Sequence, residues 1–154
     1  MFASLLRRLG GHPWFAAVGR AYVPVDRALS RVSRGRVVAL GQRALPSLLL
    51  TTVGRSSGQP RRNPLLYVPD GDAYVVIGSN WGQAHHPNWS TNLLAHPDAI
   101  VTTAGHEVPV RARLVRGEER ARLRAKLLDM WPAYATYEVR SGGRPLRIFR
   151  LEPR

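Results

Sequence analysis

The chain has 154 residues, of which 44% are hydrophobic, and its 23 Lys and Arg against 10 Asp and Glu give a formal net charge of +13. This length predicts one domain with a sizeable core, and the apolar fraction excludes disorder as the main state. The absence of cysteine excludes a disulfide scaffold, a thiolate nucleophile and a Cys-ligated metal centre. No stretch offers about 20 consecutive apolar residues, so no membrane-spanning helix is expected.

Residues 1–46 are expected to form a basic, partly helical segment ahead of the main domain. Eight of them are arginine and only Asp26 is acidic, while Trp14, Phe15 and Val18 recur at helical spacing. Such a segment favours an anionic lipid surface, a nucleic acid or a polyanionic small molecule, and a solvated basic face is the alternative left open. The arginines follow the first apolar residues, which argues against a cleaved signal peptide.

The middle of the chain predicts strands joined by tight turns. Its apolar, β-branched runs are bounded by Gly, Pro, Asp and Ser, and Pro69–Asp72 is the strongest hairpin signal. One helix is expected at Pro87–His96, stopped by Pro97. The expected strands are Ser47–Val53, Asn63–Val68, Ala73–Ser79, Ala99–Thr103 and Glu107–Val115.

The last part of the chain predicts a long helix and a final strand. Residues 117–138 carry two glutamates in the expected first turn and an apolar stripe at helical spacing, and Leu146–Leu151 is a short apolar strand. The strands come as hairpins, without regular strand–helix–strand alternation. We therefore expect an α+β fold in which residues 47–154 form a closed, mainly antiparallel sheet with flanking helices.

Thr51–Tyr67 (TTVGRSSGQPRRNPLLY) is the stretch that points most directly to chemistry. A strand ends in a glycine-bounded loop that carries Arg55 and two serines, and the next strand begins with Arg61 and Arg62. Backbone N–H groups, hydroxyls and guanidinium groups that converge from neighbouring strands suit a phosphate. A hairpin with solvated arginines is the alternative that the spacing leaves open.

Three segments carry a resemblance to a known family: GRSSGQPRRNPLLYV, DGDAYVVIGSNWGQAHHPNWSTNLLAHPDAIV and GEERARLRAKLLDMWPAYATYE. They resemble, in one collinear order between Leu48 and Pro153, the deazaflavin (F420)-dependent nitroreductase family. The resemblance implies a split β-barrel related to the flavin-binding barrels, with F420 as the cofactor. It also implies hydride transfer from reduced F420 to an apolar acceptor such as a quinone, an enone or a nitroaromatic compound. In such a reaction the protein supplies binding and orientation.

Carried over residue by residue, the resemblance implies a cofactor site built from several stretches of chain. The loop after the first strand would hold the phosphate and tail, and a strand and an aromatic segment would flank the ring. The implied cofactor-binding residues are Arg55, Ser56, Ser57, Arg61, Arg62, Asn63, Pro64, Leu65, Leu66, Ile77, Gly78, Ser79, Asn80, Asn88, Trp89, Ser90, Thr91, Asn92 and Tyr134.

The resemblance places the hydride acceptor against Trp131, Tyr134 and Tyr137. The two tyrosines are the candidate catalytic residues, because a phenol can donate a hydrogen bond or a proton to the acceptor. On the helix expected over residues 117–138, the i, i+3, i+6 spacing would put all three rings on one face as an aromatic wall. A plain core stripe is the alternative reading of that spacing.

Two positions depart from the family pattern. Ser56 and Asn80 stand where relatives often carry lysine, which puts cofactor affinity and tail preference in question more than the fold. FMN is therefore the alternative cofactor. No metal site is expected, since His85 and His86 are adjacent and would point apart.

Two further functions stay open beside the F420 enzyme. One is a split-barrel protein that binds FMN, a tetrapyrrole pigment or a fatty acid, and the other is a non-catalytic basic module for membrane or nucleic acid. Nucleic acid is not expected as the main partner, because the aromatic residues do not interleave with the basic run. We expect a cytoplasmic protein with peripheral contact between residues 1–46 and the inner face of the cell membrane, and we leave its oligomeric state open.

Overall fold

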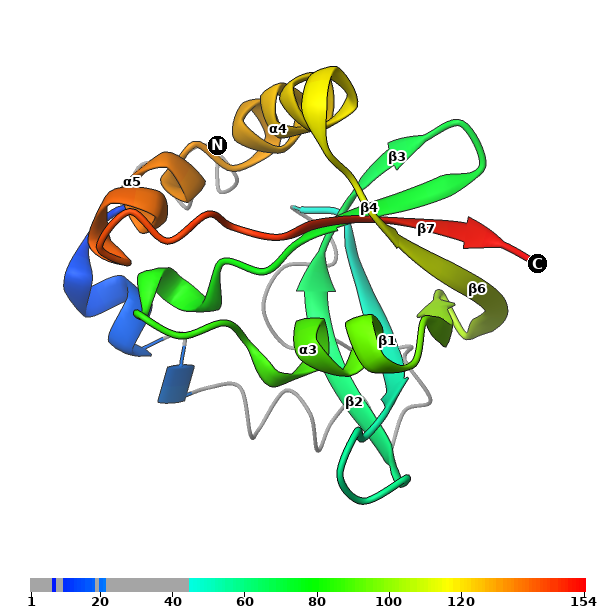
Figure 1. Cartoon of the computed structure of the whole chain (residues 1–154). Helices are drawn as coiled ribbons and strands as arrows, with labels where there is room; N and C mark the ends of the chain where they lie inside the picture. Colours follow the sequence, from blue (N-terminus) through cyan, green and yellow to red (C-terminus); the bar gives the residue numbers. More distant parts are fainter. Residues whose placement is uncertain (1–6, 8–9, 19, 22–44) are drawn as a thin grey trace.

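The computed structural model describes residues 7, 10–18, 20–21 and 45–154 (Figure 1). The helices in this part are η1 (Asn80–Gly82), α3 (Asn88–Ala95), α4 (Gly117–Met130) and α5 (Ala133–Arg140). The strands are β1 (Ser47–Val53), β2 (Pro60–Leu66), β3 (Val68–Asp70), β4 (Ala73–Ile77), β5 (Asp98–Thr103), β6 (His106–Leu114) and β7 (Ile148–Pro153).

The seven strands form one antiparallel sheet in the order β2-β1-β5-β6-β7-β4-β3. The α+β split-barrel fold that was predicted is confirmed, but the expected closure is wrong. Among the described residues β2 and β3 form the two edges of the sheet, so the curled sheet stays open as a half-barrel. In the sequence a single residue, Tyr67, separates β2 from β3, and its N–H donates to the Pro46 carbonyl at 3.1 Å.

Alternation along the central strands divides the core into two clusters. On β4, Val75 and Ile77 pack with α4 and α5, whereas Val76 packs with α3. On β7, Ile148 joins the first cluster and Phe149 joins the second. Successive side chains of a strand point to opposite faces, so both faces of the sheet centre are buried. Figure 1 shows α4 and α3 on opposite sides of β7.

The helix expected over residues 117–138 is in fact two helices, α4 and α5. The break falls at Trp131, whose φ of −138° and ψ of 87° lie outside the helical region. Pro132 follows it, and proline disfavours the helical conformation in the residue before it. Trp131 therefore does not share one helical face with Tyr134 and Tyr137, which corrects the predicted aromatic wall.

Several strand boundaries differ from the prediction by up to three residues. The run expected at Asn63–Val68 is divided between two strands, and the first of them extends back to Pro60. The final strand begins at Ile148, where its pairing with Ile77 of β4 begins, and the Leu146 carbonyl instead accepts a hydrogen bond from Arg120 Nη2 at 2.9 Å.

Only part of the expected N-terminal segment lies within the described residues. Residues 13–18 and 20–21 are helical, and the Phe15 ring lies 6.3 Å from that of Trp131. The other residues of the segment (1–6, 8–9, 19 and 22–44) lie outside the description, so the division of the chain at residue 46 stays a prediction. In the part of the chain that the structure describes, no helix is both long enough and apolar enough to span a membrane.

Candidate functional site

The loop between β1 and β2 is a tight turn that offers hydrogen-bond donors. Gly54 N–H donates to the Gln59 carbonyl at 2.8 Å, and Gly58 N–H donates to the Gly54 carbonyl at 2.8 Å. A Cβ on Gly54 would lie 2.6 Å from Ser57 Oγ and 3.2 Å from the Gln59 carbonyl oxygen, so a side chain there would displace the Ser57 hydroxyl. The N–H groups of Ser56 and Ser57 are in exposed residues and have no acceptor within the described structure. Such a loop suits an anion.

The start of β2 lies against this loop, as the convergence of the two strands predicts. Arg61 Nη2 donates to Ser57 Oγ at 3.3 Å, and Arg62 is exposed beside it. The other predicted residues of the strand are half-buried and pair with β1; they are Asn63, Pro64, Leu65 and Leu66.

Arg55 connects the loop to the first two turns of α3. Its Nη1 donates to Asn92 Oδ1 at 2.9 Å, and its backbone N–H donates to the same oxygen at 3.2 Å. Weaker contacts of 3.4 Å run from the guanidinium to Asn88 O and Oδ1. Asn92 is buried, and its Nδ2 donates to Thr52 Oγ1 on β1 at 3.4 Å. Two predicted cofactor segments far apart in the sequence therefore meet here.

The predicted ring-flanking segment Ile77–Asn80 is held by an arginine that the sequence did not single out. Arg144 donates to the carbonyls of Gly78 at 3.2 Å and Ser79 at 3.0 Å, and also to Gln83 O and His86 Nδ1. Asn80 at the end of this segment and Trp81 directly after it have positive φ values of 46° and 55°. A bulky residue rarely adopts that conformation, so Arg144 stabilises a strained loop.

Arg147 is the second residue that the sequence reasoning missed. Its Nη1 donates to Ser90 Oγ at 3.2 Å and to Thr91 Oγ1 at 3.0 Å, on α3. Trp89, the remaining residue of the predicted cofactor-binding segment Asn88–Asn92, is buried and packs against Phe149. Nothing in the sequence could mark Arg144 or Arg147, because arginines occur throughout the chain and these contacts join residues more than 50 positions apart.

The predicted acceptor residues Trp131, Tyr134 and Tyr137 lie in the core, each 5% exposed or less. Tyr137 Oη donates to the Gly10 carbonyl at 2.7 Å, and a Cβ on Gly10 would overlap the Trp131 ring, with Cη2 at 2.9 Å. Burial raises the pKa of the Tyr134 phenol above its usual value of about 10 and also raises the pKa of Tyr137. The three residues do meet, and the described stretch at residues 10–15 contacts Trp131 and Tyr137.

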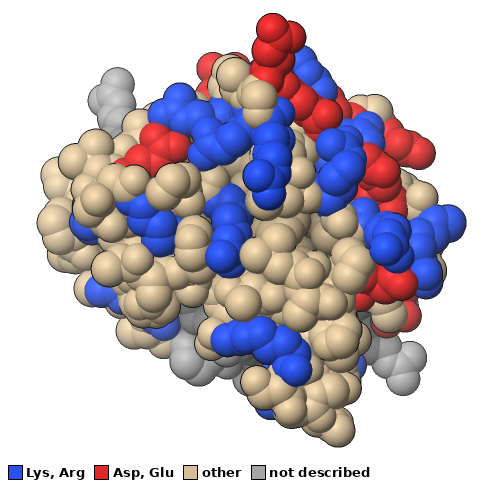
Figure 2. All heavy atoms as spheres, viewed as in Figure 1, with Lys and Arg blue, Asp and Glu red and all other residues tan. Residues whose placement is uncertain are grey.

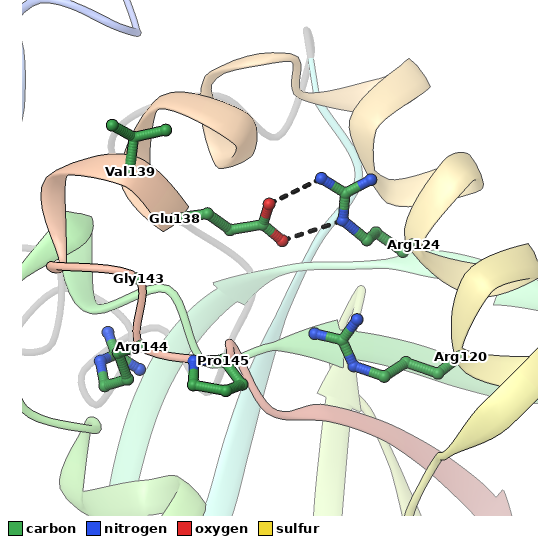
Figure 3. A pocket seen from close by; sticks show the side chains of 7 residues that line it. All are labelled: Arg120, Arg124, Glu138, Val139, Gly143, Arg144 and Pro145. Atoms are coloured by element: carbon green, nitrogen blue, oxygen red, sulfur yellow. Dashed lines mark hydrogen bonds and ion pairs between the residues drawn. The ribbon is translucent and has the colours of Figure 1, made fainter.

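An open hollow of about 420 Å³ lies between α4, α5 and the loop before β7 (Figure 3). Arg124 and Glu138 face each other across it in a bidentate pair, with N–O distances of 2.9 and 2.6 Å. Arg120 comes from the same helix as Arg124, and Arg144 lies on the opposite side. None of the predicted site residues lines this hollow, and the guanidinium groups of Arg124 and Arg144 are engaged in protein contacts. We therefore place the candidate site at the β1–β2 loop and α3.

The charge distribution suits an anionic ligand at this place. Figure 2 shows basic side chains on an otherwise uncharged surface over the start of α3 and the β1–β2 loop, whereas most acidic side chains gather toward β3, β6 and the C-terminus. Loop N–H groups, serine hydroxyls and the Arg61 guanidinium are the donors that a phosphate with an acidic tail requires. The donor set thus fits F420.

Comparison with known proteins agrees with this chemistry. The profile of the F420H(2)-dependent quinone reductase family matches residues 25–153. An F420H(2)-dependent quinone reductase of Mycobacterium tuberculosis is 36% identical over 99 residues, which are 64% of this chain and 66% of that relative. The matched stretch therefore spans slightly less than two thirds of the relative's length.

Solved structures support the fold and the family. The structure of an F420-H2 dependent reductase, FDR-A, superposes with a TM-score of 0.64 at 32% identity, covering 70% of this chain and 94% of that one. A heme binding protein from Mycobacterium smegmatis, at 20% identity and a TM-score of 0.56 over 71% of this chain and 47% of that one, shares the fold alone. The chain thus belongs to the F420H(2)-dependent quinone reductase family, whose enzymes use reduced F420 as the reductant.

Proposed function

We propose that this chain binds reduced F420 and transfers a hydride from it to a quinone. The observation that carries the proposal is the junction of Arg55 with Asn88 and Asn92, which joins two predicted cofactor-binding stretches in a member of this family. F420 supplies the hydride, because it has carbon where a flavin has N5. The chain's own residues bind the cofactor, orient it and exclude water.

The β1–β2 loop would hold the anionic side of the cofactor. The N–H groups of Ser56 and Ser57, the Ser57 hydroxyl and Arg61 supply donors on one exposed surface. Arg55 has a different task, since Asn92 already engages its N–H and one guanidinium nitrogen. It fixes α3 against the loop and adds positive charge next to it.

The acceptor side would be formed by Trp131, Tyr134 and Tyr137. The stretch at residues 10–15 contacts Trp131 and Tyr137, so the acceptor would reach these two rings when that stretch moves. Movement would release the Tyr137 hydroxyl from the Gly10 carbonyl, and the phenol could then donate a hydrogen bond to a quinone oxygen. Nitroaromatic compounds are electron-poor planar acceptors like quinones, and we propose them as alternative substrates.

We also propose that the N-terminal segment touches the inner face of the cell membrane. The helical stretch at 13–18 presents Trp14, which is 56% exposed, and Val18, which is 45% exposed. Arg7 and Arg20 are exposed on either side of this stretch in the sequence, which suits anionic headgroups. In cosedimentation, vesicles with anionic phospholipid should retain the protein better than neutral ones, and Trp14→Ala should reduce retention; equal retention on both vesicles contradicts the contact.

A binding titration tests the cofactor assignment. F420 and FMN are titrated separately into the wild-type protein, Arg55→Glu and the control Arg111→Glu, which makes the same charge change at an exposed pair with Asp98. We expect F420 to bind more tightly than FMN. Arg55→Glu should weaken F420 binding by about 10- to 100-fold, since it removes the contact that fixes α3 against the loop and reverses the charge beside the anionic ligand. Equal affinity in Arg55→Glu and the control would contradict the assignment.

A further inference from the structure

Three groups that can carry positive charge gather beside α3. Arg144 and Arg147 precede β7, and His86 precedes α3. The ion pairs in the described structure take up Asp70, Asp98, Glu119, Glu138 and Glu152, and none of them includes these three groups. Burial lowers the pKa of all three groups, and the nearby arginine charges lower those of Arg144 and His86 further. A bound anion would offset both the lost solvation and the repulsion among these positive charges.

Arg147 has the donors that such an anion needs. Only its Nη1 is engaged, by Ser90 Oγ and Thr91 Oγ1. Its Nε and Nη2 have no acceptor in the part of the chain that is described, and they are not sealed from solvent. The Ser90 hydroxyl donates to the Pro87 carbonyl at 2.9 Å, whereas Thr91 Oγ1 keeps its own proton available. Arg144 is bound by backbone carbonyls and acts as a fixed charge behind them.

This place is distinct from the Arg55 contact. A helical residue turns by about 100°, so Asn88 and Asn92 share one face of α3 while Ser90 and Thr91 lie on others. The first turn of α3 contains no acidic residue and has no side-chain cap. Its backbone partial charge therefore adds to Arg147.

We propose that Arg147, Thr91 and the first turn of α3 form a second oxyanion site, which takes a phosphate or carboxylate group. The group can come from a free anion or from the acidic side chain of bound F420, and only the second source rests on the proposed function. The planar guanidinium fork suits two oxygens of one such group.

Inorganic phosphate is the probe, titrated at constant ionic strength and followed by the NMR signals of the Arg147 Nε–H and the Thr91 amide. Both signals should move in a saturable manner in the wild-type protein. Arg147→Gln should weaken the response of Thr91 about tenfold and leave that of Ser57 in the β1–β2 loop unchanged, whereas Arg147→Lys should be intermediate. The amide spectrum reports whether each variant is folded. A Thr91 signal that stays still in the folded wild-type protein, or moves equally in folded Arg147→Gln, overturns the proposal.

A second arm separates the sources. F420 and its alcohol form, which lacks the phosphate and the glutamates, are each added before phosphate. If F420 alone moves the Thr91 signal and abolishes its phosphate response, the oxyanion belongs to the cofactor. If the phosphate response persists with F420 bound, the site takes a free anion. Absence of F420 binding would contradict the proposed function and leave the phosphate result on the oxyanion site valid.

Discussion

Substitution of Gly10 by alanine should release the N-terminal stretch from the aromatic core. The new Cβ would overlap the Trp131 ring, which is buried and held by Phe15 on one side. Because the ring cannot yield, the stretch must move, and it then loses the 2.7 Å bond from Tyr137 and the 2.6 Å bond from Arg140 to Gly11 O. These losses amount to about 2–3 kcal/mol. The ratio of docked to undocked stretch should fall by about 30- to 150-fold.

The assay is limited proteolysis at Phe15 together with amide exchange over residues 10–18. Gly10→Ala should raise the rates of cleavage and of amide exchange by about 30- to 150-fold. Gly11→Ala is the matched control, because its Cβ would lie at an ordinary contact distance of 3.4 Å from Thr136 Oγ1. Unchanged cleavage in Gly10→Ala would refute the reasoning, since it would mean that the covering stretch is not docked by this contact.

Three further changes have defined outcomes. The Asp70 side chain, 14% exposed, pairs with Arg122 and Arg150. These arginines hold the pKa of the Asp70 carboxyl far below the usual value of about 4. The pairs therefore stabilise the fold above about pH 4, and this stabilisation is lost as the pH falls below about 4. Asp70→Asn should lower the free energy of unfolding at pH 7, measured in urea, by only about 1–2 kcal/mol, because water screens these pairs. A difference between the variant and the wild-type protein that stays the same in acid would contradict this. Asn92→Ala should lower the free energy of unfolding by about 1–3 kcal/mol and weaken F420 binding, because it leaves Arg55 without its buried acceptor. An unchanged free energy of unfolding and unchanged F420 affinity would be the contrary result. Burial raises the pKa of Tyr134, so the folded state loses stability as the pH rises above about 10. Tyr134→Phe should therefore unfold at a higher pH than the wild-type protein in an alkaline titration followed by circular dichroism. An unchanged unfolding midpoint would argue against burial as the cause.

The sequence predicts those parts of the fold that depend on local signals. β1 has the predicted bounds because Pro46 and Gly54 enclose a short run of apolar and β-branched residues. The β3–β4 hairpin follows from its Pro-Asp-Gly-Asp turn. Pro132 also indicates the helix break at Trp131, but the i, i+3, i+6 spacing of the aromatic residues favoured one continuous helix.

Contacts between distant elements could not be predicted in the same way. The loop that carries Arg55 was identified from its composition, but its attachment to Asn92 depends on how the sheet curls around α3. Likewise, Arg147 meets Thr91 only because β7 passes beside that helix, and no periodic pattern reports such a pairing. The placement of the N-terminal stretch over Tyr137 depends on the close approach of Gly10 to Trp131 and on hydrogen bonds from Tyr137 and Arg140 to carbonyls of that stretch.

Hydride transfer from reduced F420 to a quinone at this site can be followed directly. The protein is mixed anaerobically with F420H2 and a soluble naphthoquinone, and the return of the oxidised deazaflavin absorbance is recorded. We expect protein-dependent reoxidation that requires the quinone and is weakened by Arg55→Glu but not by Arg111→Glu. F420H2 that stays reduced in the presence of folded protein and quinone would contradict it.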